Sequence, residues 1–182
     1  MAATGTKSRR RRLPCCHSME DAMAARKKAA SKRTPDAIRL LKADHAEVSA
    51  LFEKYDKGDR LAPVQKRALA EEICEALTAH ARIEEEVFYP ACDEAVQKAE
   101  DLLAEARVEH QALKALIARI EAQQPGTCEF DAEVKVLGEY VKHHVKEEQD
   151  ELFPKVRKSD LDLEELGARL AERKTDLERP TD

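Results

Sequence analysis

The chain has 182 residues, of which 42% are hydrophobic, 38% charged and only 4% aromatic, with five glycines and no tryptophan. A composition dominated by Ala, Leu, Glu, Lys and Arg favours helices over an extended sheet, so we expect an all-α protein. No apolar run approaches the roughly 20 residues that a membrane helix needs, so we expect no membrane partner. The five cysteines have no paired spacing and the N-terminus lacks the apolar core of a secretory signal, which favours a cytoplasmic location.

Charge divides the chain into a basic start and an acidic remainder. Residues 1–33 hold ten Lys or Arg against two Asp or Glu, whereas the rest holds 22 against 35. The first segment has almost nothing to bury, so we predict a disordered basic tail over residues 1–33. A solubilising role is the simpler interpretation of this tail, and we expect no nucleic-acid partner for it.

The first predicted helix begins at Thr34-Pro35, where threonine can cap a helix and proline can occupy its first position. From there apolar residues recur at steps of three and four until Lys57-Gly58-Asp59, and His45 stands on the same stripe. Tyr55 also lies on it. We interpret Tyr55 as a residue at the edge of the core, with hydrogen-bond donation or oxidation near a site as the alternatives.

The second predicted helix starts near Pro63 and is disturbed at Tyr89-Pro90. Its apolar stripe includes His80 and Glu84, which are four residues apart and therefore share one face. Cys74 flanks this stripe. A buried structural thiol is the simpler interpretation of Cys74, and a redox role is the alternative.

The third helix is predicted over roughly residues 97–123, with His110 on its apolar stripe and Gln124-Pro125-Gly126 as its end. The fourth begins near Asp131, carries His144 and Glu148 on its stripe, and closes near Pro154. A last amphipathic helix, Ser159 to about Leu177, is predicted to lie against the bundle or to meet a protein partner.

The second and fourth helices repeat one motif. Each has a histidine, a glutamate four residues later and a proline ten residues after the histidine, and His45 and His110 precede these histidines by 35 and 34 residues. The repeat predicts two helical hairpins that form an up-down-up-down four-helix bundle with a short extra C-terminal helix. We therefore divide the chain into a tail at 1–33, a bundle at 34–157 and a C-terminal segment at 158–182.

The inward stripes together bring four imidazoles and two carboxylates into a small core. Burying such groups without partners is costly, which favours a bound metal pair. Nitrogen and oxygen ligands without cysteine suit iron, and manganese or zinc less well. We predict two iron ions bridged by Glu84 and Glu148, with two histidines on each ion and positions left open for an oxo bridge, O2 or peroxide. A metal-free relic is the alternative. The six predicted ligands are His45, His80, Glu84, His110, His144 and Glu148.

Four segments carry a resemblance to a known family. Lys42-Ala43-Asp44-His45, His80 through Pro90, Glu109 through Leu113 and His144 through Pro154 resemble the motifs of hemerythrin-like (HHE cation-binding) domains over roughly residues 35–157. The resemblance implies a four-helix bundle around a non-haem di-iron centre that binds O2 or related oxidants. The family includes oxygen carriers, oxygen or iron sensors, and proteins that deal with peroxide or nitric oxide.

The chain departs from the oxygen carriers of that family at two places. Lys114 stands where the carriers have another histidine, and Glu148 follows His144 by four residues where they have aspartate five residues after histidine. We interpret Lys114 as reaching solvent, with contact to an anionic metal-bound ligand as the alternative. His143 would restore the spacing of five but lies off the inward stripe. The glutamates at 85 and 147 are interpreted as solvated flanks or, alternatively, as extra ligands.

These observations predict a non-haem di-iron protein that binds or reacts with O2 or peroxide, in oxidative-stress handling or in oxygen or iron sensing. The alternative is a metal-dependent regulatory module without turnover, in which a tail or the C-terminal helix relays metal occupancy to a protein partner. Whether the protein is an enzyme stays open at this point.

Overall fold

The computed structural model describes residue 1 and residues 35–58 and 60–179, and in this part of the chain every regular element is a helix. The all-α expectation is therefore confirmed, whereas the predicted basic tail falls almost wholly outside the described residues. The long helices are α2 (Ala37–Asp56), α3 (Pro63–Ile83), α5 (Glu100–Ala122), α6 (Cys128–Glu147) and α8 (Leu163–Glu178). Shorter elements are η1 (Glu84–Phe88), α4 (Tyr89–Ala95), η2 (Glu148–Leu152) and α7 (Phe153–Val156).

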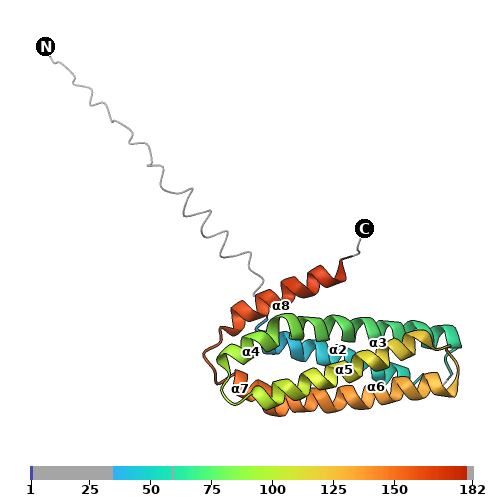
Figure 1. Ribbon diagram of the computed structural model, residues 1–182. Helices are drawn as coiled ribbons and strands as arrows, with labels where there is room; N and C mark the ends of the chain where they lie inside the picture. The colour runs from blue at the N-terminus through green and yellow to red at the C-terminus, as the bar shows by residue number, and fades with distance from the viewer. Residues whose placement is uncertain (2–34, 59, 180–182) are drawn as a thin grey trace. The chain divides into compact units, whose positions relative to one another are not determined.

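The predicted up-down-up-down bundle is formed by α2, α3, α5 and α6, which lie side by side in Figure 1. Helix α8 lies on the outside of this bundle against α2 and α3. None of the helices in the described ranges is both long and apolar enough to cross a membrane.

Side-chain caps set the starts of α2 and α8, and both move the predicted boundaries. Helix α2 begins at Ala37 instead of Pro35, because the Asp36 carboxylate accepts a hydrogen bond from the Arg39 N–H at 2.9 Å. Helix α8 begins at Leu163 instead of Ser159, because the Asp162 carboxylate accepts from two backbone N–H groups of the first turn.

The helix is disturbed just before Tyr89-Pro90, as the sequence predicted, and the fourth predicted helix closes near Pro154 with α7, which ends at Val156. In each case the chain passes through one π-helical turn, η1 or η2, and then continues as an α-helix. The N–H of Tyr89 donates to the carbonyl of Glu84, and the N–H of Phe153 donates to the carbonyl of Glu148. A widened turn tolerates the following proline, because proline has no N–H to give to the preceding turn.

Two apolar clusters of buried side chains fill the bundle. One gathers Phe88, Tyr89 and Phe153 with Leu166 and Leu170 of α8, so α8 is part of the core. The other gathers residues from the opposite ends of the four long helices, among them Val48, Ile73, Phe130 and Leu137. This division matters for the site. One pocket beside the inward histidines is lined by residues of the first cluster, and a second pocket by residues of the other cluster.

Candidate metal centre

The six predicted ligands come together in the interior of the bundle. Each long helix of the bundle contributes one histidine, and the two glutamates begin the two π-helical turns. None of the six residues is more than 5% exposed. The residues and their elements are His45 on α2, His80 on α3, Glu84 on η1, His110 on α5, His144 on α6 and Glu148 on η2.

The imidazoles form two pairs, one from each predicted hairpin. The Nε2 atoms of His45 and His80 are 3.0 Å apart, and those of His110 and His144 are 3.2 Å apart. In both pairs the ring centroids are 4.7 Å apart. The equal spacing reflects the sequence repeat and gives the site a pseudo-two-fold arrangement.

Each glutamate contacts one imidazole of each pair. The Glu84 Oε2 lies 3.3 Å from the His80 Nε2 and 3.5 Å from the His110 Nε2. The Glu148 Oε2 lies 3.3 Å from the His45 Nε2 and 3.8 Å from the His144 Nε2. A carboxylate in such a position has one pair of imidazoles on either side of it.

The buried oxygens of these glutamates lack hydrogen-bond donors. Both oxygens of Glu84 and the Oε2 of Glu148 are buried without a hydrogen-bond partner. Two groups of side chains have ligand atoms within 4.8 Å of one another, and Glu84 belongs to both. The groups are His45, His80, Glu84 and Glu148, and Glu84, His110 and His144. Unpaired buried carboxylates are costly, so a pair of cations fits the polar atoms that this interior presents.

The electrostatics of the site separate the two carboxylates. Burial and the charge of Glu148 raise the pKa of Glu84 well above its usual value. Burial also opposes ionisation of Glu148, but contact with His45 and the charge of His144 prevail and lower its pKa to about 2. Burial, with the nearby His144, lowers the pKa of His110 to about 4. Neutral imidazole is the form that binds metal.

The residue before the first histidine of each repeat supports the second histidine. The Glu109 Oε2 lies 2.8 Å from the His144 Nδ1, and the Asp44 Oδ2 lies 3.6 Å from the His80 Nδ1. Such outer carboxylates fix the orientation of an imidazole and increase its basicity as a ligand. Asp44 also accepts a hydrogen bond from Lys174 of α8 at 2.9 Å.

The residue after each glutamate supports a histidine of the other hairpin. The Glu85 Oε1 lies 3.0 Å from the His110 Nδ1, and the side-chain amide of Gln149 lies 3.1 Å from the His45 Nδ1. All four Nδ1 atoms therefore face outward and all four Nε2 atoms face inward. Three of the Nδ1 atoms lie within 3.1 Å of an outer partner, whereas that of His80 faces Asp44 without a hydrogen bond. With metal on Nε2, His45 needs an acceptor at Nδ1, which the amide oxygen of Gln149 supplies once the amide is turned over.

Tyr89 belongs to the site although the sequence analysis treated it only as a disturbance of the helix. Its hydroxyl donates a hydrogen bond to the Glu148 Oε1 at 2.9 Å and lies 3.3 Å from the His110 Nε2. Phe153 occupies the corresponding position of the second repeat and stacks on His45, with ring centroids 5.9 Å apart. Both residues immediately precede the repeated proline, and that is the signal by which sequence reasoning could have found them.

The flanking residues have roles that the sequence left open or did not show. The Lys114 side chain is partly exposed, and its Nζ binds both oxygens of Glu85 at 2.7 and 2.6 Å. It therefore does not face the inward atoms. The His143 side chain is 63% exposed and points away from the six, as the stripe predicted. Tyr55 donates to Asp131 at 2.7 Å and to none of the six. Burial raises the pKa of Cys74 to about 12, which keeps its thiol protonated and favours a structural role.

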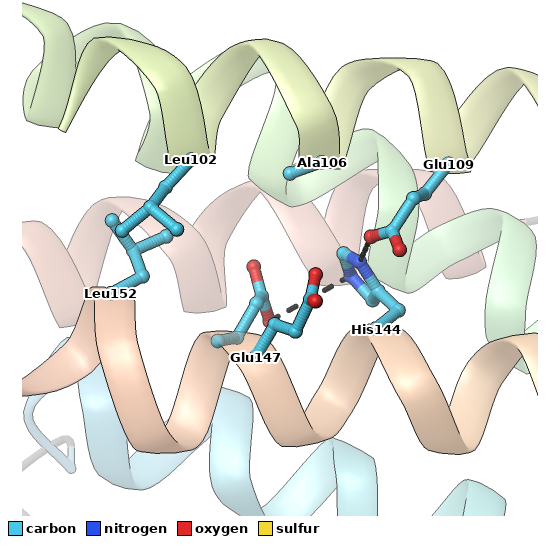
Figure 2. A pocket seen from close by; sticks show the side chains of 7 residues that line it. Leu102, Ala106, Glu109, His144, Glu147 and Leu152 are labelled. Carbon is cyan, nitrogen blue, oxygen red and sulfur yellow. Dashed lines mark hydrogen bonds and ion pairs between the residues drawn. The ribbon is translucent and has the colours of Figure 1, made fainter.

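Two small pockets adjoin the candidate centre, each with room for a molecule about the size of water. The first, shown in Figure 2, lies between α5 and α6 with its extension η2, and has polar and apolar walls. The second is lined by all four inward histidines, and its other walls are apolar: Val48, Leu77, Ala81, Leu113, Val141 and Val145.

Residues 36–156 match the family of the Hemerythrin HHE cation binding domain. The chain belongs to this family. The resemblance seen in the motifs is therefore confirmed, and cation binding is the property that the family's description carries.

A solved structure agrees with this membership, and a curated relative is similar in sequence. The fold resembles the crystal structure of a hemerythrin HHE cation-binding domain-containing protein from Mycobacterium kansasii, with a TM-score of 0.66 and 26% identity over 79% of this chain and 87% of that one. A DNA nickase of Nostoc sp. is 32% identical over 122 residues, which are 67% of this chain and 33% of the nickase. The HHE chain thus spans about a third of that relative.

Proposed function

We propose that the six inward side chains bind two iron ions and that the loaded protein binds or reacts with O2 or peroxide. His45 and His80 would hold one ion, His110 and His144 the other, and Glu84 and Glu148 would bridge them. The observation that supports this proposal is that each carboxylate lies against one imidazole of each pair. A redox-active iron pair with open coordination positions supplies the chemistry of O2 and peroxide.

The surrounding residues are suited to that chemistry. The apolar side chains beside the histidines, such as Leu113, Val141 and Val145, keep bulk water out while leaving space for a small ligand. On the opposite side the Tyr89 hydroxyl oxygen lies 2.9 Å from the Glu148 Oε1, and its proton can be donated to a neighbouring acceptor. The described cysteines are all unpaired, which supports a reducing cytoplasm as the place of action.

Iron loading of the purified apoprotein tests the proposal. We expect anaerobic Fe²⁺ to bind at two ions per chain, and the optical absorption of the oxidised protein to fade on reduction and return in air. Glu84→Gln should lose most of the iron, because it removes a ligand shared by both ions. Glu133→Gln is the matched control, since Glu133 is also buried on the bundle but pairs with Arg119. Iron content near zero in the unmodified protein would remove the proposal.

A further inference from the structure

We propose that Glu109, His143 and Glu147 form an outer site that takes a divalent cation from solvent and passes it to the buried centre. The transfer rests on the function proposed above, because it needs the buried centre as its destination. The existence of the outer site does not depend on that function.

The three side chains have the geometry of a cation site. The His143 Nε2 lies 3.2 Å from the Glu147 Oε1 and 3.6 Å from the Glu109 Oε1, and the ligand atoms are all within 4.8 Å of one another. His143 and Glu147 are four residues apart on α6, the same spacing as the inward His144 and Glu148 shifted by one residue. The shift turns this second ligand pair outward, where solvent reaches it.

A pocket connects the outer side chains to the buried ones. Glu109 and Glu147 line the pocket of Figure 2 together with His144 and Glu148. The Glu147 side chain is 27% exposed, whereas that of Glu148 is 2% exposed and its Oε2 has no hydrogen-bond partner. An ion held by Glu109 and Glu147 would therefore adjoin a pocket that is also lined by Glu148, a carboxylate of the buried centre.

Glu109 belongs to the outer group and also contacts His144 of the buried centre. One of its oxygens, Oε2, lies 2.8 Å from the His144 Nδ1, and the other faces His143. On the opposite side of the pseudo-two-fold arrangement the equivalent carboxylate, Asp44, already has a cation, the ammonium group of Lys174. In the described part of the chain the ion-pair partners of Glu109 are the two histidines 143 and 144. Asp44 is thus paired with a lysine ammonium group, whereas Glu109 is paired with two histidines, whose ring nitrogens can bind a metal cation.

The first repeat has no counterpart of the outer site. The residues that precede His80 and Glu84 are Ala79 and Ile83, which offer no ligand atoms. The outer site is therefore a feature of the second repeat alone, and it makes one side of the symmetric centre the entrance for cations.

Zinc binding by the full chain measures the outer site directly. Equilibrium dialysis of the apoprotein against Zn²⁺ should give two tightly bound ions and a third, weaker one. His143→Gln and Glu147→Gln should each lose the third ion and keep the two tight ones. Glu139→Gln is the control, because Glu139 is an exposed carboxylate one turn earlier on α6 and lies outside the group.

The rate of loading measures the transfer. In anaerobic stopped-flow mixing with limiting Fe²⁺, both variants should fill the buried centre about tenfold more slowly than the unmodified protein, because they lose a site that concentrates cations beside it. Glu139→Gln should load at the unmodified rate. The final iron content should be the same in all four proteins.

The outcomes separate this inference from the function proposed above. A third Zn²⁺ that survives both substitutions, or an unmodified protein that loses no Zn²⁺ with either substitution, would overturn the outer site. Loss of the third ion with unchanged loading rates would overturn the transfer. If the unmodified protein binds a single Zn²⁺ that His143→Gln removes, the outer site stands and the di-iron function and the transfer both fail.

Discussion

The four inward imidazoles are held by residues that stand next to the predicted ligands in the sequence. Asp44 and Glu109 precede a histidine, while Glu85 and Gln149 follow a glutamate. Because helix neighbours point about 100° apart, a residue adjacent to a ligand reaches the side of another helix instead of the centre. Each predicted ligand of this kind is thus adjacent in the sequence to a residue that contacts a different imidazole.

Tyr89 is the residue that breaks the symmetry of the centre. It places a hydroxyl beside Glu148 and His110, whereas its counterpart Phe153 offers only an apolar ring to His45. The two halves of the site therefore differ in hydrogen bonding although their imidazoles are arranged alike.

Tyr89→Phe should destabilise the metal-free protein. The substitution removes a buried hydrogen bond to a carboxylate, which is worth about 1.5–3 kcal/mol of the free energy of unfolding. Urea unfolding of the chelator-treated protein measures the loss. Tyr140→Phe is the control, because Tyr140 is 49% exposed on α6 and should change stability little. Equal stability of the two variants would show that the Tyr89 hydroxyl contributes nothing to the fold.

Among the elements, the π-helical turns explain why Tyr89 reaches the site. In an α-helix a residue five positions after Glu84 would lie well around the axis from it. In η1 the hydrogen bond from the Tyr89 N–H to the Glu84 carbonyl stacks residue 89 over residue 84, and η2 does the same for Phe153 over Glu148. Proline in the sequence signalled a local disturbance of the helix, but it did not say that the helix would continue.

Helix α8 is the element that connects the site to the outside of the bundle. Its Leu166 and Leu170 are buried in the core, and its Lys174 holds Asp44, which faces His80. Gly167 permits this close approach, because a Cβ atom there would lie 2.3 Å from the Pro35 carbonyl oxygen. In the regulatory alternative, a C-terminal helix relays metal occupancy. The contacts from His80 through Asp44 to Lys174 offer a physical route for that relay.

Hydrogen exchange can test that relay. Metal on the His80 Nε2 should strengthen the interaction of its Nδ1 with Asp44 and so hold Lys174 more firmly. We expect amide exchange in α8 to slow about fivefold on metal binding. Lys174→Gln should abolish this difference while leaving the difference within α3 intact. Identical exchange of α8 in the metal-free and loaded proteins would contradict the relay.

For the molecule as a whole, metal removal should lower stability. Without cations the bundle buries two carboxylates whose free oxygens lack donors, and metal that binds only the folded state adds about 2.7 kcal/mol at a hundredfold excess over its Kd. Thermal unfolding with Fe²⁺ or with a chelator should therefore show a higher midpoint for the loaded protein. The Glu84→Gln variant should show little difference. A midpoint that metal does not change would favour the metal-free relic.

The bundle and its six inward side chains could be predicted because they depend on periodicity and repetition. His80 and Glu84 share a face by their spacing alone, and the second repeat places His144 and Glu148 in the same way. That the six are metal ligands stays a prediction. The outer contacts could not be foreseen, because the pairing of Glu85 with His110 or of Lys174 with Asp44 depends on how separate helices pack.

Each hairpin holds a histidine of the other hairpin, and this affects how the centre forms. Glu85 of the first hairpin steadies His110 of the second, and Gln149 of the second steadies His45 of the first. With metal bound as proposed, neither half would supply all the ligands by itself, so the centre would form only once the halves have docked. We therefore expect two fragments, made by dividing the chain between Val96 and Ala99, to bind metal when they are mixed. Neither fragment should bind metal by itself.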